Sequence, residues 1–236
     1  MLELELLGLL ELALALGRPI RHCLVIGLGG GLAPRLLEAH NLKCESVEID
    51  PQILRLARRE FGFAGRCTIA DGRRFLAHTD LTWDLIFLDV CTSEQLALHL
   101  FTVEALQAAR RRLTEGGILA VQFIGDDGPW SASVLRTVEH VFGRAVCLAP
   151  PGTDGLVGPR WIFASPQPLP PAPQPADLAR CNPFPPGPRQ PTFQPPVPWR
   201  IVRVGAPGRL CTDDHFPAEH DWHRTAIRWR RSHSFP

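Results

Sequence analysis

Short apolar runs alternate with amphipathic helical patterns along the first 164 of the 236 residues, and this alternation constrains the fold most strongly. Residues 23–26, 46–49, 67–70, 85–88 and 118–123 read as strands, and residues 32–40, 51–61, 102–113 and 131–142 as helices. Such alternation indicates right-handed crossovers, and hence a mostly parallel sheet with helices on both faces. Residues 145–148 and 161–164 flank a Gly/Pro-rich loop and predict an antiparallel edge hairpin. The sequence therefore predicts a doubly wound, Rossmann-like α/β fold with seven strands.

The composition changes after Ala164, where proline dominates residues 165–198. Proline lacks a backbone N–H and cannot build ladders or helix interiors, so this stretch reads as an extended linker. Beyond it, residues 201–204 are candidates for another edge strand, and the chain from Pro217 onward has helical spacing. We therefore expect a domain at 1–164 that completes the alternating pattern, a Pro-rich linker at 165–198, and a tail with a short helix at 199–236.

Composition and charge argue against several classes of function. A net charge of +1 lacks the basic excess that is typical of nucleic-acid binding. Glu3, Glu5 and Glu11 interrupt the apolar N-terminus, which predicts an amphipathic helix and neither a membrane span nor a signal peptide. The seven cysteines are scattered without a CxxC pair, which favours a reducing cytoplasm over a disulfide framework or a zinc ribbon. His220 and His223 near the end of the chain are more simply helix residues than metal ligands, so no metal is expected.

A glycine cluster follows the first predicted strand, in the sequence LVIGLGGG. Gly27, Gly29 and Gly31 at this point let the backbone turn tightly and approach a ligand, and the next helix offers unpaired N–H groups. Glu48 lies at the end of the second strand, about 20 residues on, where a carboxylate can accept both hydroxyls of a ribose. Each feature alone is ordinary, since glycines make turns and a surface acid is common. Their spacing together indicates a nucleoside site.

A third polar element follows the next strand, in the sequence IADGRRFL. Asp71 there could accept a hydrogen bond from an adenine amino group, with Gly72 beside it, although Asp71 also fits the cap of a following helix. Three polar elements at three successive strand ends strengthen the nucleoside interpretation. Trp83 and Phe123 are expected to pack around strand ends, and either is a candidate for flanking the adenine.

Five stretches together resemble the spermidine synthase group of the class I S-adenosylmethionine-dependent methyltransferase fold. They are LVIGLGGG, VEIDPQILRLARREF, IADGRRFL, WDLIFLDV and LTEGGILAVQF, and they cover about residues 20–125. The tail CTDDHFPAEH is similar to the closing segment of bacterial spermidine synthase-like proteins. The resemblance implies S-adenosylmethionine or its decarboxylated form as cofactor, Glu48 on the ribose, Asp71 near the adenine and Asp89 beside the reacting centre.

Asp89 is the candidate catalytic residue. Transfer of an alkyl group from a sulfonium is an in-line displacement, so the protein has to align a nucleophile and keep its lone pair available. A primary amine is protonated at neutral pH, and a carboxylate at the carboxyl end of the fourth strand can orient it and take its proton. The other interpretation of Asp89 is a cap for the following helix. A small-molecule amine is the expected substrate, and a homodimer is left open.

Three positions differ from the aminopropyltransferase pattern. Thr92 stands where those enzymes carry a second aspartate, with Ser93 in place of the following proline. Gly30 stands where their glycine loop carries an acid. The alternatives to aminopropyl transfer are therefore a methyltransferase with another acceptor and a nucleoside-binding relative without turnover.

Overall fold

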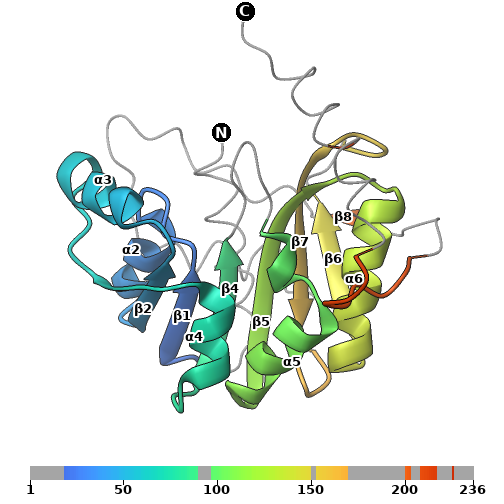
Figure 1. The fold of residues 1–236 in the computed structure, drawn as a ribbon, viewed down its shortest axis with the longest axis horizontal. Helices are drawn as coiled ribbons and strands as arrows, with labels where there is room; N and C mark the ends of the chain where they lie inside the picture. Colours follow the sequence, from blue (N-terminus) through green and yellow to red (C-terminus); the bar gives the residue numbers. More distant parts are fainter. Residues whose placement is uncertain are drawn as a thin grey trace, which may run out of the picture.

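A single mixed sheet organises the computed structural model, which describes residues 19–89, 97–149, 153–169, 200–202, 208–216 and Thr225. Its strands are β1 (His22–Ile26), β2 (Lys43–Glu48), β3 (Arg66–Ile69), β4 (Trp83–Asp89), β5 (Leu113–Gly125), β6 (Ala145–Ala149), β7 (Gly158–Ala164) and β8 (Arg200–Ile201). They lie in the order β3-β2-β1-β4-β5-β7-β6-β8 (Figure 1). The seven predicted strands are thus confirmed, and β8 extends the sheet by two residues at one edge.

Strand directions follow the prediction. From β3 through β2, β1 and β4 to β5, every neighbouring pair is parallel. The predicted antiparallel hairpin is β6 and β7, and β7 also pairs antiparallel with β5. Because β1 is flanked by β2 on one side and β4 on the other, the strand order reverses between β1 and β4. Open α/β sheets bind their ligands at such a switch point.

The helices are α2 (Leu32–Ala39), α3 (Pro51–Phe61), α4 (Gly72–His78), α5 (Val103–Arg111) and α6 (Pro129–Phe142), with a 3₁₀ turn, η1 (Leu98–Leu100), before α5. Local capping explains where α3 begins and ends: Asp50 accepts from the N–H of Gln52, Pro51 occupies the first turn, and Gly62 ends the helix with φ 65°. Helix α4 was missed from the sequence. It has seven residues, too few for a clear periodic signal.

The sheet buries a separate apolar cluster on each face. Leu24 and Ile86 face α5 and α6, whose Leu106 and Val134 belong to the same cluster. Side chains one position along the strands, such as Val25, lie on the other face with residues of α2. Parallel strands covered on both faces are expected to be apolar throughout, which is why these segments appear in the sequence as uninterrupted apolar runs.

Residues beyond the expected boundary at Ala164 complete the main core. Val202 and Cys211 are 4% and 0% exposed within the cluster that contains α5 and α6. Strand β8 pairs antiparallel with β6, which confirms the edge strand expected near residue 201. Most of the Pro-rich linker and of the predicted C-terminal helix lies outside the described residues, so the domain division stays a prediction. The described tail residues Val202 and Cys211 nonetheless pack in the same core.

Residues 208–216, which we term the tail segment, cross α4, α5 and α6. The N–H of Cys211 donates to Thr137 Oγ1 of α6 over 3.1 Å, and its carbonyl accepts from the N–H of Val103 in α5 over 2.8 Å. Arg73 in the first turn of α4 forms a bidentate ion pair with Asp213. The tail segment therefore ties three helices together. Among the described residues, no helix is both long and apolar enough to cross a membrane.

Candidate functional site

The candidate residues gather where β2, β1, β4 and β5 end. Ile26 of β1 pairs with Val47 of β2 and with Leu88 of β4. The residues that follow these three positions, Gly27, Glu48 and Asp89, therefore lie on neighbouring strands at the carboxyl edge of the sheet. This edge includes the switch point between β1 and β4, where a crevice for a ligand is expected.

The glycine turn after β1 shows why the sequence needs glycine there. Gly27, Gly29 and Gly31 have φ values of 94°, 52° and 77°, a region that favours glycine. A Cβ at Gly31 would come within 2.7 Å of the Phe63 ring, whereas a Cβ at Gly29 would meet nothing within 4 Å. Gly29 is thus the position at which the backbone lies open to an incoming group, and Gly31 is required by packing.

Glu48 is held in place by the backbone around it. Its Oε2 accepts from the N–H of Leu28 in the glycine turn, and its Oε1 accepts from the N–H of Asp50, each over 2.9 Å. The residue is only 8% exposed. A carboxylate oxygen can accept two hydrogen bonds, so each oxygen keeps capacity for a further donor. The glycine turn and Glu48 therefore form one preorganised unit.

Asp89 ends β4 beside this unit. Burial raises the pKa of Asp89 to about 6, and the negative charge of Glu48 adds to the shift. A carboxyl group with such a pKa can both bind and release a proton near neutral pH, which is what acid–base chemistry requires. The residues that follow, including Thr92, lie outside the described part of the chain.

The register of the sheet adds Gln122, which the sequence analysis did not single out. Gln122 of β5 is the direct partner of Asp89 of β4, and it is 6% exposed. Partners in register project from the same face of a sheet, so the side chains of Gln122 and Asp89 lie on the same face of neighbouring strands. Only the pairing of β4 with β5 reveals this neighbour, because the two residues are far apart in the sequence.

Asp71 takes the position expected at the end of β3. Its Oδ1 accepts from the N–H of Arg74 over 2.8 Å, which confirms it as the cap of α4, and its Oδ2 lies 2.9 Å from Nε2 of His99. Burial works to raise the pKa of Asp71, but the hydrogen bonds from Arg74 and His99 together lower it. Asp71 therefore stays ionised, and its second oxygen has a partner that the sequence did not predict.

Three other predictions need correction or restriction. A Cβ at Gly72 would overlap Ile26, so the structure gives this glycine a packing role, and its contact with a cofactor stays a prediction. Trp83 begins β4 at the opposite edge of the sheet, where it packs against Phe75, and Phe123 is wholly buried in the core. Neither aromatic ring flanks the candidate site. His220 lies outside the described residues, as does His223.

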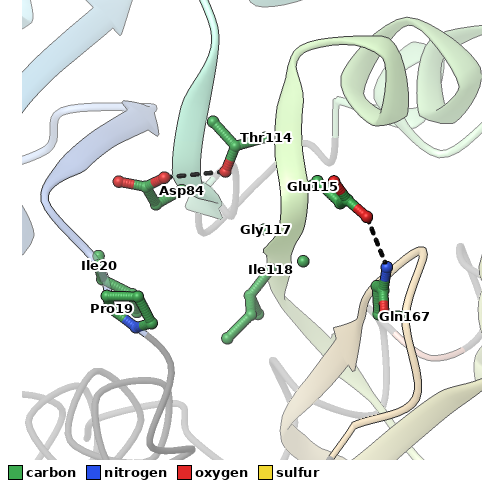
Figure 2. A pocket seen from close by; sticks show the side chains of 9 residues that line it. Pro19, Ile20, Asp84, Thr114, Glu115, Gly117, Ile118 and Gln167 are labelled. Atoms are coloured by element: carbon green, nitrogen blue, oxygen red, sulfur yellow. Dashed lines mark hydrogen bonds between the residues drawn. The ribbon is translucent and has the colours of Figure 1, made fainter.

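A hollow of about 590 Å³ lies at the opposite, amino edge of the sheet (Figure 2). Asp84 on its wall accepts from the backbone N–H groups of Arg21 and His22 and from Thr114 Oγ1. Glu115 accepts from the side-chain amide of Gln167 across the same space (Figure 2). These contacts join the starts of β1, β4 and β5, so this hollow is distinct from the candidate site.

Comparison with known proteins places the chain in a family. The Spermine/spermidine synthase domain matches residues 9–147. A polyamine aminopropyltransferase from Vibrio vulnificus is 34% identical over 135 residues, 52% of this chain and 42% of that protein. An N-terminal histidine N-methyltransferase from Emericella nidulans is 32% identical over 129 residues, 51% of this chain and 23% of that protein. The chain thus spans less than half the length of either relative.

Solved structures agree with the fold. Human Methyltransferase-like protein 13 in complex with SAH superimposes with a TM-score of 0.56 at 26% identity, over 77% of this chain and 86% of that chain. A probable spermidine synthase from Corynebacterium glutamicum has a TM-score of 0.70 at 18% identity, over 88% of this chain and 80% of that chain, which supports the fold alone. These neighbours share the class I methyltransferase-like fold. Since the domain match covers more than half of its length, the chain belongs to the spermine/spermidine synthase domain family, whose relatives named here are transferases.

Proposed function

We propose that the protein binds S-adenosylmethionine or its decarboxylated form and transfers an alkyl group from the sulfonium to an amine, with Asp89 as the general base. The observation that carries this proposal is the position of Asp89 at the switch point beside Glu48, with its pKa raised to about 6. A carboxylate that only caps a helix acts as an acceptor in its ionised form, so a raised pKa would not help that role. Family membership supports the same class of reaction.

The residues of the carboxyl edge suit an adenine nucleoside. Gly29 leaves its backbone open, which allows close approach, and the fixed Glu48 oxygens can each accept one ribose hydroxyl. Asp71 offers an ionised carboxylate for the nucleobase at the end of β3. When bound, the nucleoside supplies a carbon activated by a positively charged sulfur. The residues present thus fit a nucleoside sulfonium without rearrangement of the glycine turn.

Asp89 prepares the acceptor. At pH 7 a group with a pKa of about 6 is mostly ionised, so it can attract an ammonium and remove its proton. Asp89 is then a neutral carboxyl group, and the amine can donate a remaining N–H to its carbonyl oxygen, which leaves the lone pair directed at the sulfonium carbon. Gln122, in register with Asp89, offers an amide that can help to orient the same amine.

The nature of the transferred group separates two candidates. Aminopropyl transfer to a diamine is favoured by the domain match, whereas Thr92 removes the second carboxylate that would receive the distal ammonium. A charged group that enters a crevice without a partner carries a desolvation penalty. Thr92 and the similarity to Methyltransferase-like protein 13 therefore favour methyl transfer as the second candidate.

Putrescine is expected to be a poor acceptor of the natural protein, because its distal ammonium lacks the carboxylate that Thr92 replaces. Transfer assays should pair S-adenosylmethionine and its decarboxylated form with a panel of monoamines, diamines and peptides with amino termini. Efficient spermidine formation would contradict this role of Thr92. Absence of transfer across the whole panel would favour the non-catalytic relative.

Glu48→Ala is expected to weaken nucleoside binding by about 1.5–3 kcal/mol, because charge-assisted hydrogen bonds to the ribose are lost. Calorimetric titration with 5′-methylthioadenosine measures this change directly. Glu45→Ala, on the same strand but away from the carboxyl edge, serves as the matched control and should bind as the wild type does. Equal affinity of the Glu48 variant and the wild type would contradict the proposed site.

A further inference from the structure

His99 is the one described histidine whose ring contacts a residue of the candidate nucleoside site. It belongs to η1, between β4 and α5, and its Nε2 lies 2.9 Å from Oδ2 of Asp71 at the end of β3. The side chain of His99 is 45% exposed and that of Asp71 is 23% exposed. The pair is therefore partly exposed to solvent near the carboxyl edge of the sheet.

The hydrogen bonds of Asp71 fix both of its oxygens. The N–H of Arg74 holds Oδ1, and His99 holds Oδ2, so the plane of the carboxylate cannot turn. Each oxygen still has acceptor capacity for one further donor. A carboxylate oriented in this way accepts from an amino group, and it repels an atom that offers only lone pairs. The Asp71 carboxylate therefore favours a purine with an amino group at position 6 over a purine with an oxygen at that position.

We propose, on the basis of the proposed nucleoside site, that His99 is the positioning residue through which Asp71 selects a 6-aminopurine nucleoside. His99 keeps the Asp71 carboxylate oriented toward the crevice. The bound base donates its amino hydrogen to the same carboxylate. A base with oxygen at this position meets an anion and is rejected.

Other charged groups surround the pair but are engaged among themselves. Helix α4 and α5 both pack against η1. Arg73 of α4 forms its ion pair with Asp213, and Glu104 of α5 accepts from the N–H of Asp213. Arg74 is the remaining charged residue in the first turn of α4. Of these groups, His99 is the titratable one that is hydrogen-bonded to Asp71.

The test compares the affinities for 5′-methylthioadenosine and 5′-methylthioinosine by calorimetry near pH 7. Both ligands are uncharged under these conditions, so a difference in affinity reports the contact with the base. We expect the wild type to prefer the amino form by about 10–100-fold, as for a hydrogen bond to a charged group.

Two substitutions of His99 distinguish a positioning role of its side chain from a packing role. His99→Gln can still donate to Asp71 and should keep the preference for the amino form. His99→Ala should bring the preference below about 5-fold. His78→Gln is the matched control, because His78 lies at the other end of α4 and bonds to the carbonyl of Arg74. It should behave as the wild type does.

Unchanged selectivity in the His99→Ala protein would overturn the proposal while leaving the nucleoside site intact. Failure of the wild type to bind either ligand would overturn the proposed function and this inference together.

Discussion

Replacing Asp89 with asparagine lowers the rate of group transfer by roughly 10²–10⁴-fold, the range expected for the loss of a general base. Asparagine keeps the size and hydrogen-bonding capacity of the side chain but cannot take a proton from an ammonium. Nucleoside binding should change little, because the ribose and base contacts come from Glu48 and Asp71. Single-turnover rates and calorimetric affinities, measured on the same preparation, separate the two effects.

The dependence of kcat/KM on pH tests the same role of Asp89. Asp89 acts as a base only when ionised, so kcat/KM of the wild type should rise as the pH passes upward through about 6. In the Asp89→Asn protein that rise should be absent. Asp80→Asn, at a fully exposed acid, is the matched control and should keep both the rate and the profile. A normal profile in the Asp89 variant would show that another group is the base.

Stability provides a second check on the same residue. The folded pKa of Asp89 lies above the ordinary aspartate value of 3.8, so the folded state holds its proton more tightly than the unfolded chain does. This group therefore favours folding below about pH 4, and the contribution is lost as the pH rises through about 6. Asp89→Asn should be at least as stable as the wild type at pH 8. Low activity of the variant then cannot be assigned to unfolding.

The Asp127→Ala protein should lose about 3 kcal/mol of unfolding free energy, because it leaves a buried guanidinium without its carboxylate. Arg160 of β7 is 0% exposed, and one of its Nη2 contacts is Asp127 Oδ1 at 3.3 Å. The same nitrogen donates to the carbonyl of Leu156 over 2.7 Å. The other Asp127 oxygen accepts from the N–H of Gly155 over 2.9 Å. Asp127 thus joins the end of β5 to the β6–β7 loop.

Denaturant unfolding of three further proteins tests this interpretation. Arg160→Met removes the buried charge together with the need for a partner, so it should cost less than Asp127→Ala. The double variant should be no less stable than Asp127→Ala alone, because contacting residues are not additive. Asp214→Ala, at an exposed acid of the tail segment, should stay within about 0.5 kcal/mol of the wild type. Equal stability of the Asp127 variant and the wild type would contradict the proposed ion pair.

The fold could be predicted from the sequence because both faces of the sheet are covered. The central strands β1 and β4 are therefore mainly apolar, and the helices between the strands keep a 3.6-residue pattern. The start of α3 was placed correctly because Asp50 and Pro51 are strong local signals. The position of β8 also followed from its apolar run. These elements depend on short-range chemistry that one sequence contains.

The candidate site was predictable only in part. Glu48, Asp71 and Asp89 follow strand ends, so parallel topology alone brings them to one edge. Gln122 and His99 depend on strand register and on the packing of η1, which residue spacing does not encode. The role of Gly72 likewise depends on Ile26, a residue from another strand. The roles of these residues depend on neighbours that only the folded structure brings together, and local sequence patterns do not contain this information.

The docking of the tail segment has a consequence for the order in which the protein can fold during synthesis. Domains form as their residues leave the ribosome, beginning with the N-terminal part. The faces of α5 and α6 that meet Cys211 are made long before that residue, so they stay uncovered while the proline-rich stretch is translated. Contacts between residues so far apart also form slowly, because closing a long loop is entropically unfavourable. A ribosome that stalls shortly before residue 200 therefore displays a nascent chain in which strands β1 to β7 can pair, but whose helical face still needs protection by a chaperone.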